Sequence, residues 1–379
     1  MKFIGDIDNP VTLTQALDGS LPIQAGEIIY LRGGTYRGDY VSLINGTKEL
    51  PIVIKPYPGE LPIIDGGFQN SGNYVTIQDI EFTYTGWANR SASVESERRS
   101  VNLSGVGNIL SNCMIHDVYL VGSWQTNMDG GLRECIVYNV GAITTEAGYE
   151  GQGHGHCIYT QNEFEFQTHK NNILCMAYNY GMHAYTEGGL LNNFKLQQNI
   201  CFRNGGRQFA TGGLGGQRLR YSEISDNCAY EGGSFLQGSN ITLTNNYFPQ
   251  GYTITEISEF LTESGNFYGP KPASGVEIKI FPLELLHIGA HIAIFNWDLA
   301  DAVDVDLSTV TGLNVGDNYQ LRNGVDPFGD IVTGVVPADK VISVDMKAVS
   351  HSIAQRIGDA ASTPATTFPE FGAFRLEKQ

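Results

Sequence analysis

The stretches NCMIHDVY (112–119) and ECIVYNVG (134–141) decide the fold, because the same short phrase returns along the chain. Each copy runs from a small apolar residue through a strand-like stretch to a polar residue and, in most copies, a glycine. The other copies are DIEFTYTG (79–86), LCMAYNYG (174–181), ICFRNGG (200–206) and NCAYEGG (227–233). Aligned on Ile80, Cys113, Cys135, Cys175, Cys201 and Cys228, neighbouring copies lie 33, 22, 40, 26 and 27 residues apart.

This repeat predicts a solenoid with coils of about 22–27 residues, which is typical of a parallel β-helix with short strands and polar corners. A leucine-rich horseshoe is excluded, because its consensus is absent and the strand-like stretches are β-branched and aromatic. Five of the six cysteines occupy one position of the repeat, so we expect them to form a buried, reduced ladder in the core. None of the six lies in a CxxC pair.

The two ends of the chain differ from the coils. A short amphipathic stretch at 12–17 predicts a helical cap, since the open end of a β-helix exposes unpaired strand edges. After a Gly/Pro/Ser linker near residue 270, short alternating strands such as VEIKIF and HIAIFNW predict an antiparallel β-sandwich. We therefore expect a β-helix over 1–270 and a sandwich over 271–379. The sandwich either protects the C-terminal end of the helix or serves in sugar binding or oligomerisation.

Composition limits the partners. The chain has 379 residues, of which 46 are glycine, 41% are hydrophobic and 17% are charged, which is typical of a folded protein with many turns. A net charge of −17 argues against nucleic acid as a partner. No apolar run is long enough to span a bilayer, and MKFIGDIDNP does not resemble a signal peptide. Secreted and virus-associated locations both remain open.

At GTYRG (34–38), at ELPIVIKPYPGELPIIDGG (49–67) and through the asparagine-rich coils, the sequence resembles right-handed parallel β-helix proteins of the pectate lyase-like superfamily. Its opening coils resemble the alginate lyase and chondroitinase group. GHGHCIYTQN (153–162) also resembles a phrase of bacterial β-helix repeat proteins. The resemblance, which covers about residues 25–270, implies a right-handed, all-β parallel β-helix that acts on or binds a polysaccharide.

Two insertions indicate where a site lies on the solenoid. They are GWANRSASVESERR (86–99) and GAITTEAGYEGQG (141–153), and both leave the same corner of a coil. Since each coil rises about 4.8 Å, these loops should form a wall beside the strand that follows the corner. That strand aligns as HCIYTQ (156–161), MHAYTE (182–187), RQFAT (207–211) and GSFLQ (233–237).

Alternation along this strand predicts a polar, aromatic outer stripe suited to a saccharide. With Ile158, Ala184, Phe209 and Phe235 inward, His183, Gln208 and Ser234 point outward beside Cys157. The next outward ladder holds Tyr159 and Tyr185, followed by Gln161 and Glu187. His154 and His156 lie where the strand begins, and Arg207 aligns with His156 and Met182.

The first functional hypothesis is a lyase that cleaves a uronic-acid-containing glycan by β-elimination. This reaction needs a base, a group that neutralises the carboxylate and an acid for the leaving oxygen. We assign His183 as the base, Tyr185 or Tyr159 as the acid and Arg207 as the neutralising cation, with His156 assisting. Since the chain is acidic, either Arg207, Arg218 and Arg220 form a basic patch or a bound Ca²⁺ neutralises the substrate. His154, Gln161, Glu187 and Glu150 are expected to bind substrate.

Other interpretations use the same residues. A glycoside hydrolase would pair Glu187 with Glu150 or Asp129. The distance between the two carboxylates would then distinguish a retaining from an inverting mechanism. A non-catalytic glycan-binding or phage-fibre-like adhesin is a third hypothesis. Stacked Gln, Asn and Tyr side chains also stabilise β-helices without any ligand. A zinc site at His154, His156 and His183 lacks an obvious third close ligand.

Overall fold

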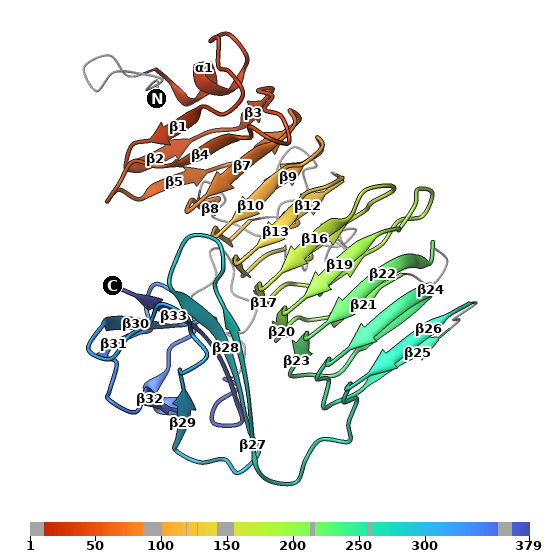
Figure 1. Cartoon of the computed structure of the whole chain (residues 1–379), viewed down its shortest axis with the longest axis vertical. Coiled ribbons are helices and arrows are strands. Elements are labelled where there is room, and N and C mark those ends of the chain that lie inside the picture. The colour runs from red at the N-terminus through yellow and green to blue at the C-terminus, as the bar shows by residue number, and fades with distance from the viewer. Residues whose placement is uncertain are drawn as a thin grey trace, which may run out of the picture.

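The computed structural model describes residues 11–85, 101–118, 120–126, 128–141, 155–212, 217–255, 259–354 and 366–379. Short strands wind into a parallel β-helix of three sheets, which we call faces 1, 2 and 3 in the order in which the chain visits them (Figure 1). This architecture agrees with the all-β parallel β-helix that the repeats predict and with the right-handed fold that the resemblance implies. No helix in the described part of the chain has the length and hydropathy needed to span a bilayer.

Face 1 consists of β1 (Ile28–Leu31), β4 (Ile52–Pro56), β7 (Val75–Gln78), β10 (Ile109–Ser111), β13 (Gly131–Arg133), β16 (Gln167–Lys170), β19 (Phe194–Gln197), β22 (Leu219–Ser225) and β26 (Leu261–Ser264). Face 2 consists of β2 (Gly34–Arg37), β5 (Pro62–Asp65), β8 (Glu81–Thr83), β11 (Met114–His116), β14 (Ile136–Tyr138), β17 (Ile173–Cys175), β20 (Ile200–Phe202) and β23 (Cys228–Ala229). Face 3 consists of β3 (Tyr40–Ser42), β6 (Phe68–Asn70), β9 (Val101–Leu103), β12 (Ser123–Gln125), β15 (Ile158–Thr160), β18 (Tyr180–Ala184), β21 (Arg207–Thr211) and β25 (Tyr252–Thr255). The long β24 (Ser234–Thr244) begins on face 3 and continues onto face 1.

The corner between faces 1 and 2 takes only two residues in most coils. The first of them adopts the left-handed conformation, for example Asn171 at φ 55° and Asp226 at φ 57°, and Asn and Asp tolerate this conformation best. The second residue of the corner is an asparagine in the later coils, and these buried or half-buried side chains stack from coil to coil as a ladder. Each ladder amide accepts from the main-chain N–H of the coil before it, as Asn227 Oδ1 does from Asn199 at 3.0 Å. The ladder consists of Asn172, Asn199, Asn227, Asn246 and Asn266.

The cysteines are buried and unbridged, as the sequence predicted, but their predicted register is wrong. Cys113 and Cys135 occupy the ladder corner, where the main-chain N–H of Cys135 donates to Asn172 Oδ1 at 3.0 Å. Cys175, Cys201 and Cys228 lie instead in the strands of face 2, where Cys201 is opposite Leu174 and Cys228 is opposite Ile200. The repeating corner position is therefore filled by Ile, Cys or Asn, and the similarity of the phrases concealed a shift of up to three residues.

The N-terminal end is closed by α1 (Leu13–Leu17), as the amphipathic stretch predicted (Figure 1). Thr12 and Gln15 form a capping box that satisfies the first N–H groups of the helix. Leu13, Ala16 and Leu17 are buried against the core of the β-helix. The helix thus covers strand edges and apolar residues that the first coil would otherwise expose.

The C-terminal residues form an antiparallel sandwich of a five-stranded and a two-stranded sheet, as the alternating strands predicted. The last β-helix ladder contact joins Tyr247 to Phe267, and β27 begins at Val276. The five-stranded sheet runs β27 (Val276–Pro282), β28 (Gly289–Asn296), β33 (Phe371–Lys378), β30 (Asn318–Asn323) and β31 (Ile331–Val335). The second sheet pairs β29 (Ala302–Asp306) with β32 (Val341–Asp345), and η2 (Ala348–Ser350) follows.

The sandwich packs on the flank of the β-helix and not over its C-terminal end, which corrects the expected end-protecting role. Figure 1 shows β28 and β33 alongside β17, β20 and β23. Phe295 and Phe371 of the sandwich share one apolar cluster with Ile173 and Phe202 of face 2. The other side of the same sheet packs on β29 and β32. All residues of β28 are buried because both sides of this strand are covered.

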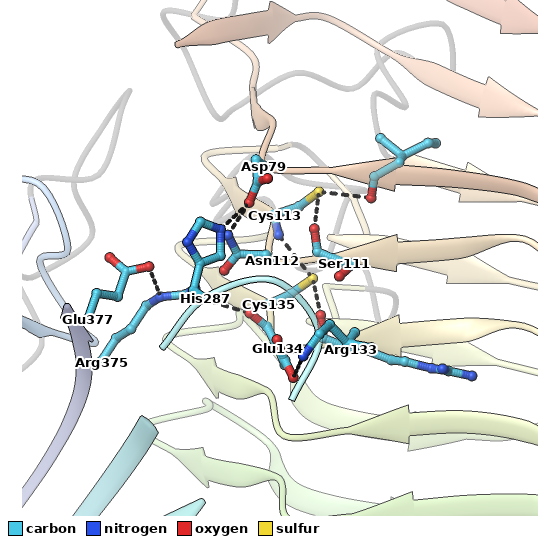
Figure 2. Close-up of polar contacts among 12 residues, drawn as sticks. Asp79, Ser111, Asn112, Cys113, Arg133, Glu134, Cys135, His287, Arg375 and Glu377 are labelled. Carbon is cyan, nitrogen blue, oxygen red and sulfur yellow. Dashed lines mark hydrogen bonds and ion pairs between the residues drawn. The ribbon is translucent and has the colours of Figure 1, made fainter. Parts of the chain in front are cut away.

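Polar contacts fix this joint at the corner between faces 1 and 2 (Figure 2). His287 Nε2 lies 2.8 Å from Asp79 Oδ1, and this contact raises the pKa of His287. Arg375 is almost fully buried and donates to the main-chain oxygen of Glu134 at 2.8 Å and to Glu377 Oε1 at 2.8 Å. Burial opposes the charge of Glu377, but Arg375 outweighs it and lowers the pKa of Glu377 to about 2. The hydrogen bonds of His287 and Arg375 to the corner therefore hold the sandwich together with the apolar contacts.

Candidate active site on face 3

The strands that carry the predicted residues lie side by side on face 3, but with a register two residues away from the expected one. Tyr159 of β15 is opposite His183 of β18, and His183 is opposite Ala210 of β21. The sequence alignment had put Tyr159 beside Tyr185. The sequence alignment assumed a separation of 26 residues between β15 and β18, whereas paired residues of these strands are 24 residues apart. The coil is longer only after β18, beyond Ala184. The inward and outward alternation of β18 is nevertheless as predicted, with Met182 and Ala184 in the core.

Three other side chains of the predicted outer stripe do not face outward. Cys157 is fully buried in the β-helix core. Gln208 is buried and exchanges hydrogen bonds with Asn204, whose Nδ2 donates to Gln208 Oε1 at 2.8 Å. Ser234 is buried as well. Cys157 precedes β15 and Gln208 is the second residue of β21, where the chain turns from face 2 to face 3 and the alternation of a strand does not hold.

Ser234 differs from these two residues, because Phe235 is opposite Ala210, in the column of His183. Phe235 thus lies on the outer side, and Leu236 is in the core. The prediction that Phe235 points inward is therefore wrong.

His156 and His183 form the centre of the site. Nδ1 of His183 lies 3.2 Å from Nε2 of His156, and the two ring centroids are 4.4 Å apart. His156 has no exposed surface and His183 is 7% exposed, so the pair is largely shielded from solvent. The expectation that His183 faces solvent is therefore wrong, although it does lie on the outer side of the strand.

Hydrogen bonding fixes which ring nitrogens carry protons. The main-chain N–H of Tyr180 donates to Nδ1 of His156 at 3.3 Å, so this nitrogen is an acceptor. In the neutral ring the proton of His156 then lies on Nε2, which faces Nδ1 of His183. His183 Nδ1 is consequently an acceptor too, and a neutral His183 carries its proton on Nε2. The hydrogen bonds from Tyr180 to His156 and from His156 to His183 therefore leave Nε2 of His183 as a donor.

Aromatic rings surround the histidine pair. The Tyr180 ring stacks on His156 at 4.9 Å and meets His183 edge-on at 4.5 Å. Tyr185 stacks on His183 at 5.0 Å, and Tyr159 lies 5.3 Å from the same ring. Trp124 of the preceding coil meets Tyr159 edge-on at 5.3 Å. The sequence analysis did not predict Tyr180 and Trp124 as site residues. Their aromatic side chains next to the predicted stripe could have indicated them.

The two tyrosines with predicted roles hold their protons tightly. Burial raises the pKa of Tyr159, although the Nε2 amide of Gln161, 3.2 Å from the phenol oxygen, acts in the opposite direction. Burial also raises the pKa of Tyr185, and the charge and hydrogen bond of Glu187 add to this effect. Both phenols are therefore neutral at physiological pH. Gln161 thus contacts Tyr159, and Glu187 contacts Tyr185.

The three candidate arginines do not form one patch. Arg207 begins β21 opposite Tyr180, not opposite Met182 as the sequence predicted, and its guanidinium lies 4.5 Å from the Phe235 ring centroid. Arg220 belongs to β22 and pairs with Ser239 on face 1. Arg218 precedes β22 and is half-buried. Arg207 and Arg220 lie on different faces, so the three arginines do not form one patch around His183.

Two further candidates, His154 and Glu150, lie outside the described residues. Asp129, the alternative partner of Glu187, forms an ion pair with Lys48 at 2.7 Å. Both insertions also lie outside the described residues, but their flanking strands show that each connects face 2 to face 3. In the described ranges, no three His, Cys, Asp or Glu side chains come together as metal ligands.

No protein-family model matches the sequence, and no curated protein matches it. Among solved structures, an alginate lyase from Paenibacillus sp. is 17% identical, with 68% of this chain and 93% of that chain covered and a TM-score of 0.49. The pectate lyase Pel9A is 14% identical over 70% of this chain and 75% of that chain, with a TM-score of 0.48. A lacto-N-biosidase from Eubacterium ramulus is 16% identical over 70% of this chain and 64% of that chain, with a TM-score of 0.34.

Proposed function

On this pectate lyase-like parallel β-helix, we propose a polysaccharide lyase that cleaves a uronic-acid-containing glycan by β-elimination at the His183 cluster. The observation that carries the proposal is the hydrogen-bonded His156–His183 pair, set among tyrosines on the outer side of face 3. Structural ladders of a β-helix stack like residues, whereas here a hydrogen-bonded histidine pair lies beside two tyrosines from neighbouring coils. Aromatic side chains with hydrogen-bond donors and acceptors also suit sugar rings.

In this proposal His183 binds the substrate carboxylate by a hydrogen bond. Its Nε2–H donates to the uronate carboxylate, which favours the negative charge that develops when the neighbouring carbon loses a proton. This role replaces the role of base given to His183 from the sequence, because a base needs a free lone pair and the donor order leaves a proton on Nε2. His156 is then a positioning residue that fixes the tautomer of His183.

Tyr185 and Glu187 together take the proton. Since the phenol of Tyr185 is neutral, its oxygen accepts the C5 proton of the uronate while its own proton passes to the Glu187 carboxylate. The C4–O bond then breaks, a double bond forms between C4 and C5, and the leaving oxygen takes a proton from Tyr159. Gln161 donates to the Tyr159 oxygen and so stabilises the phenolate that remains. Tyr185 ends as a neutral phenol, and exchange with water then removes the proton from Glu187 and returns one to Tyr159.

A substrate screen tests the reaction class. The protein is incubated with alginate, pectate, glycosaminoglycans and neutral glucans, each with and without Ca²⁺. A lyase yields an unsaturated product that absorbs in the ultraviolet, and we expect this product from a uronate polymer. New reducing ends without that absorbance would replace the lyase with a hydrolase, for which Glu187 is the first carboxylate to test. Binding without cleavage would favour an adhesin.

Variants test the residue roles. On the cleaved substrate, His183→Ala and Tyr185→Phe should each lower kcat by about 10²–10⁴-fold with the fold intact. Tyr57→Phe, a half-buried tyrosine of the N-terminal coils, is the control and should keep full activity. His156→Gln retains a donor toward His183 and should be far more active than His156→Leu. Nitrogen NMR should find the proton of His183 on Nε2, and a proton on Nδ1 would contradict the donor role.

A further inference from the structure

A second group of exposed rings lies at the corner where face 3 passes into face 1. Gln167 of β16 is opposite Phe194 of β19, which places Phe166 opposite Asn193. Arg220 pairs with Ser239 and Ser222 pairs with Ile241, so Tyr221 is opposite Asn240. Since Ile241 also pairs with Leu261, Phe260 is the next residue in the same column. Five consecutive coils thus stack Phe166, Asn193, Tyr221, Asn240 and Phe260.

The rings occupy every second position of this column. Phe166, Tyr221 and Phe260, which we call the aromatic row, are 40%, 54% and 80% exposed. With coils about 4.8 Å apart, neighbouring rings of the row are about 9.6 Å from one another. This spacing is close to the length of a disaccharide unit in an extended polysaccharide. Rings with this repeat can stack on every second sugar of one chain.

Tyr221 is in a conformation that does not favour tyrosine. Its φ is 52°, and the residues above and below it in the column, Asn193 and Asn240, have φ of 59° and 54°. Asparagine tolerates this left-handed region, whereas a bulky side chain is disfavoured there. The ring is exposed, and within the described residues its hydroxyl makes no hydrogen bond. Neither backbone geometry nor burial accounts for a tyrosine at this position.

Charge near the row is mixed. Lys195 Nζ lies 4.6 Å from the Phe166 ring centroid and 3.6 Å from Glu223, and Asn240 donates to Glu259 at 2.5 Å. The Lys195 cation is therefore paired with a carboxylate, and a ligand held here is recognised mainly by the faces of its sugar rings.

We propose that the aromatic row is a glycan-binding surface that holds an extended polysaccharide along the solenoid, outside the His183 cluster. The loop at 161–166 joins the two places, since Gln161 contacts Tyr159 at one end and Phe166 stands at the other. The proposal deepens the proposed function by giving the polymer a second hold next to the cleavage site. It does not require that the protein cleave what it binds.

Affinity gel electrophoresis against the same panel of glycans tests the row. Wild-type protein should be retarded by at least one polymer, and the triple variant Phe166→Ala, Tyr221→Asn, Phe260→Ala should bind that polymer at least tenfold more weakly. Leu61→Ala is the matched control, because Leu61 is an 81% exposed apolar residue at the N-terminal end of the molecule. Tyr221→Asn alone should weaken binding while its Tm stays equal or rises, since it copies the neighbours in the column.

The outcomes separate this inference from the lyase proposal. If the polymer is cleaved, the triple variant should raise KM for the polymer and leave kcat on a short oligosaccharide of the same glycan unchanged. If wild type binds a glycan through the row but cleaves none, the row stands and the lyase proposal fails. Absence of glycan binding by wild type, or undiminished binding by the triple variant, overturns the inference.

Discussion

His116 shows how a single buried side chain acquires charge from its neighbours. Its Nδ1 lies 2.8 Å from Asp117 Oδ2 and its Nε2 lies 3.2 Å from Glu81 Oε1, so both ring nitrogens face carboxylates. The ring also stacks on Tyr138 of face 2 and approaches Phe328 of the sandwich. Burial alone lowers the pKa of His116, but the hydrogen bonds to Asp117 and Glu81 outweigh it and raise the pKa to about 9. His116 is therefore an imidazolium ion at neutral pH.

This charge makes stability depend on pH. Because the pKa of His116 is higher in the folded than in the unfolded chain, its contribution is complete below about pH 6.5 and is lost as the pH rises through 9. A rise from 6.5 to about 9 corresponds to about 3 kcal/mol. His116→Gln should therefore lower the free energy of unfolding at pH 6 by up to that amount and change it little at pH 9.5. Urea unfolding at both pH values measures this, and an equal loss at both would contradict a charged His116.

The asparagine ladder is the element that joins one coil to the next. Asn227 accepts from the main-chain N–H and the side-chain amide of Asn199 at 3.0 and 2.9 Å, and it donates to the main-chain oxygen of Leu196 at 2.7 Å. It also donates to Asn246 Oδ1 at 3.0 Å. Because Asn227 has no exposed surface, water cannot replace these partners.

We expect Asn227→Ala to lower the free energy of unfolding by about 2–5 kcal/mol, since it leaves a main-chain N–H and a main-chain oxygen unpaired in the core. Asn266→Ala is the matched control. Asn266 makes the same contacts to Asn246 and Leu243, but it is half-buried, so water can take over part of them. Chemical denaturation should show a clearly smaller loss for Asn266→Ala, and equal losses would mean that burial of the ladder is unimportant.

The sequence predicted elements better than it predicted register. Repetition of strand and polar corner is enough to indicate a β-helix, because each coil solves the same packing problem. The cysteines misled the alignment, since Cys135 at a corner and Cys175 in a strand are both small, buried and apolar. At the site, alternation put His183 on the outer side of β18, and Tyr185 directly after this strand stacks on its ring. Alternation could not predict that the turn before β15 buries His156 under Tyr180, because that contact depends on the path of the main chain between faces.

The whole molecule is two bodies joined along a flank. Face 2 presents apolar side chains outward as well as inward, and the sandwich covers them, with Phe295 and Phe371 against Phe202. Sequence patterns indicated two kinds of β-structure. They could not show where the two parts meet, because strands that are buried on both sides have no alternation of polar and apolar residues. The boundary predicted at residue 270 stays a prediction.

Removal of the sandwich tests this arrangement. A chain that ends at Pro270 should expose Ile136, Ile173, Ile200 and Phe202 to water, so it should self-associate and bind a hydrophobic dye. Light scattering during size-exclusion chromatography measures the association, with the full-length protein as reference. A truncated chain that stays monomeric with an unchanged Tm would mean that the flank does not need its cover, and would favour a binding task for the sandwich.

The flank contact also sets where the solenoid is free to change in length. The sandwich spans a fixed set of coils, since it touches β14, β17, β20 and β23 together and reaches the corner at Asp79 through His287. A coil duplicated inside that span would separate the β-helix residues that the sandwich contacts, whereas a coil duplicated near α1 would only move the helical cap outward. We therefore expect an inserted coil to be tolerated better near α1 than inside the span that the sandwich covers.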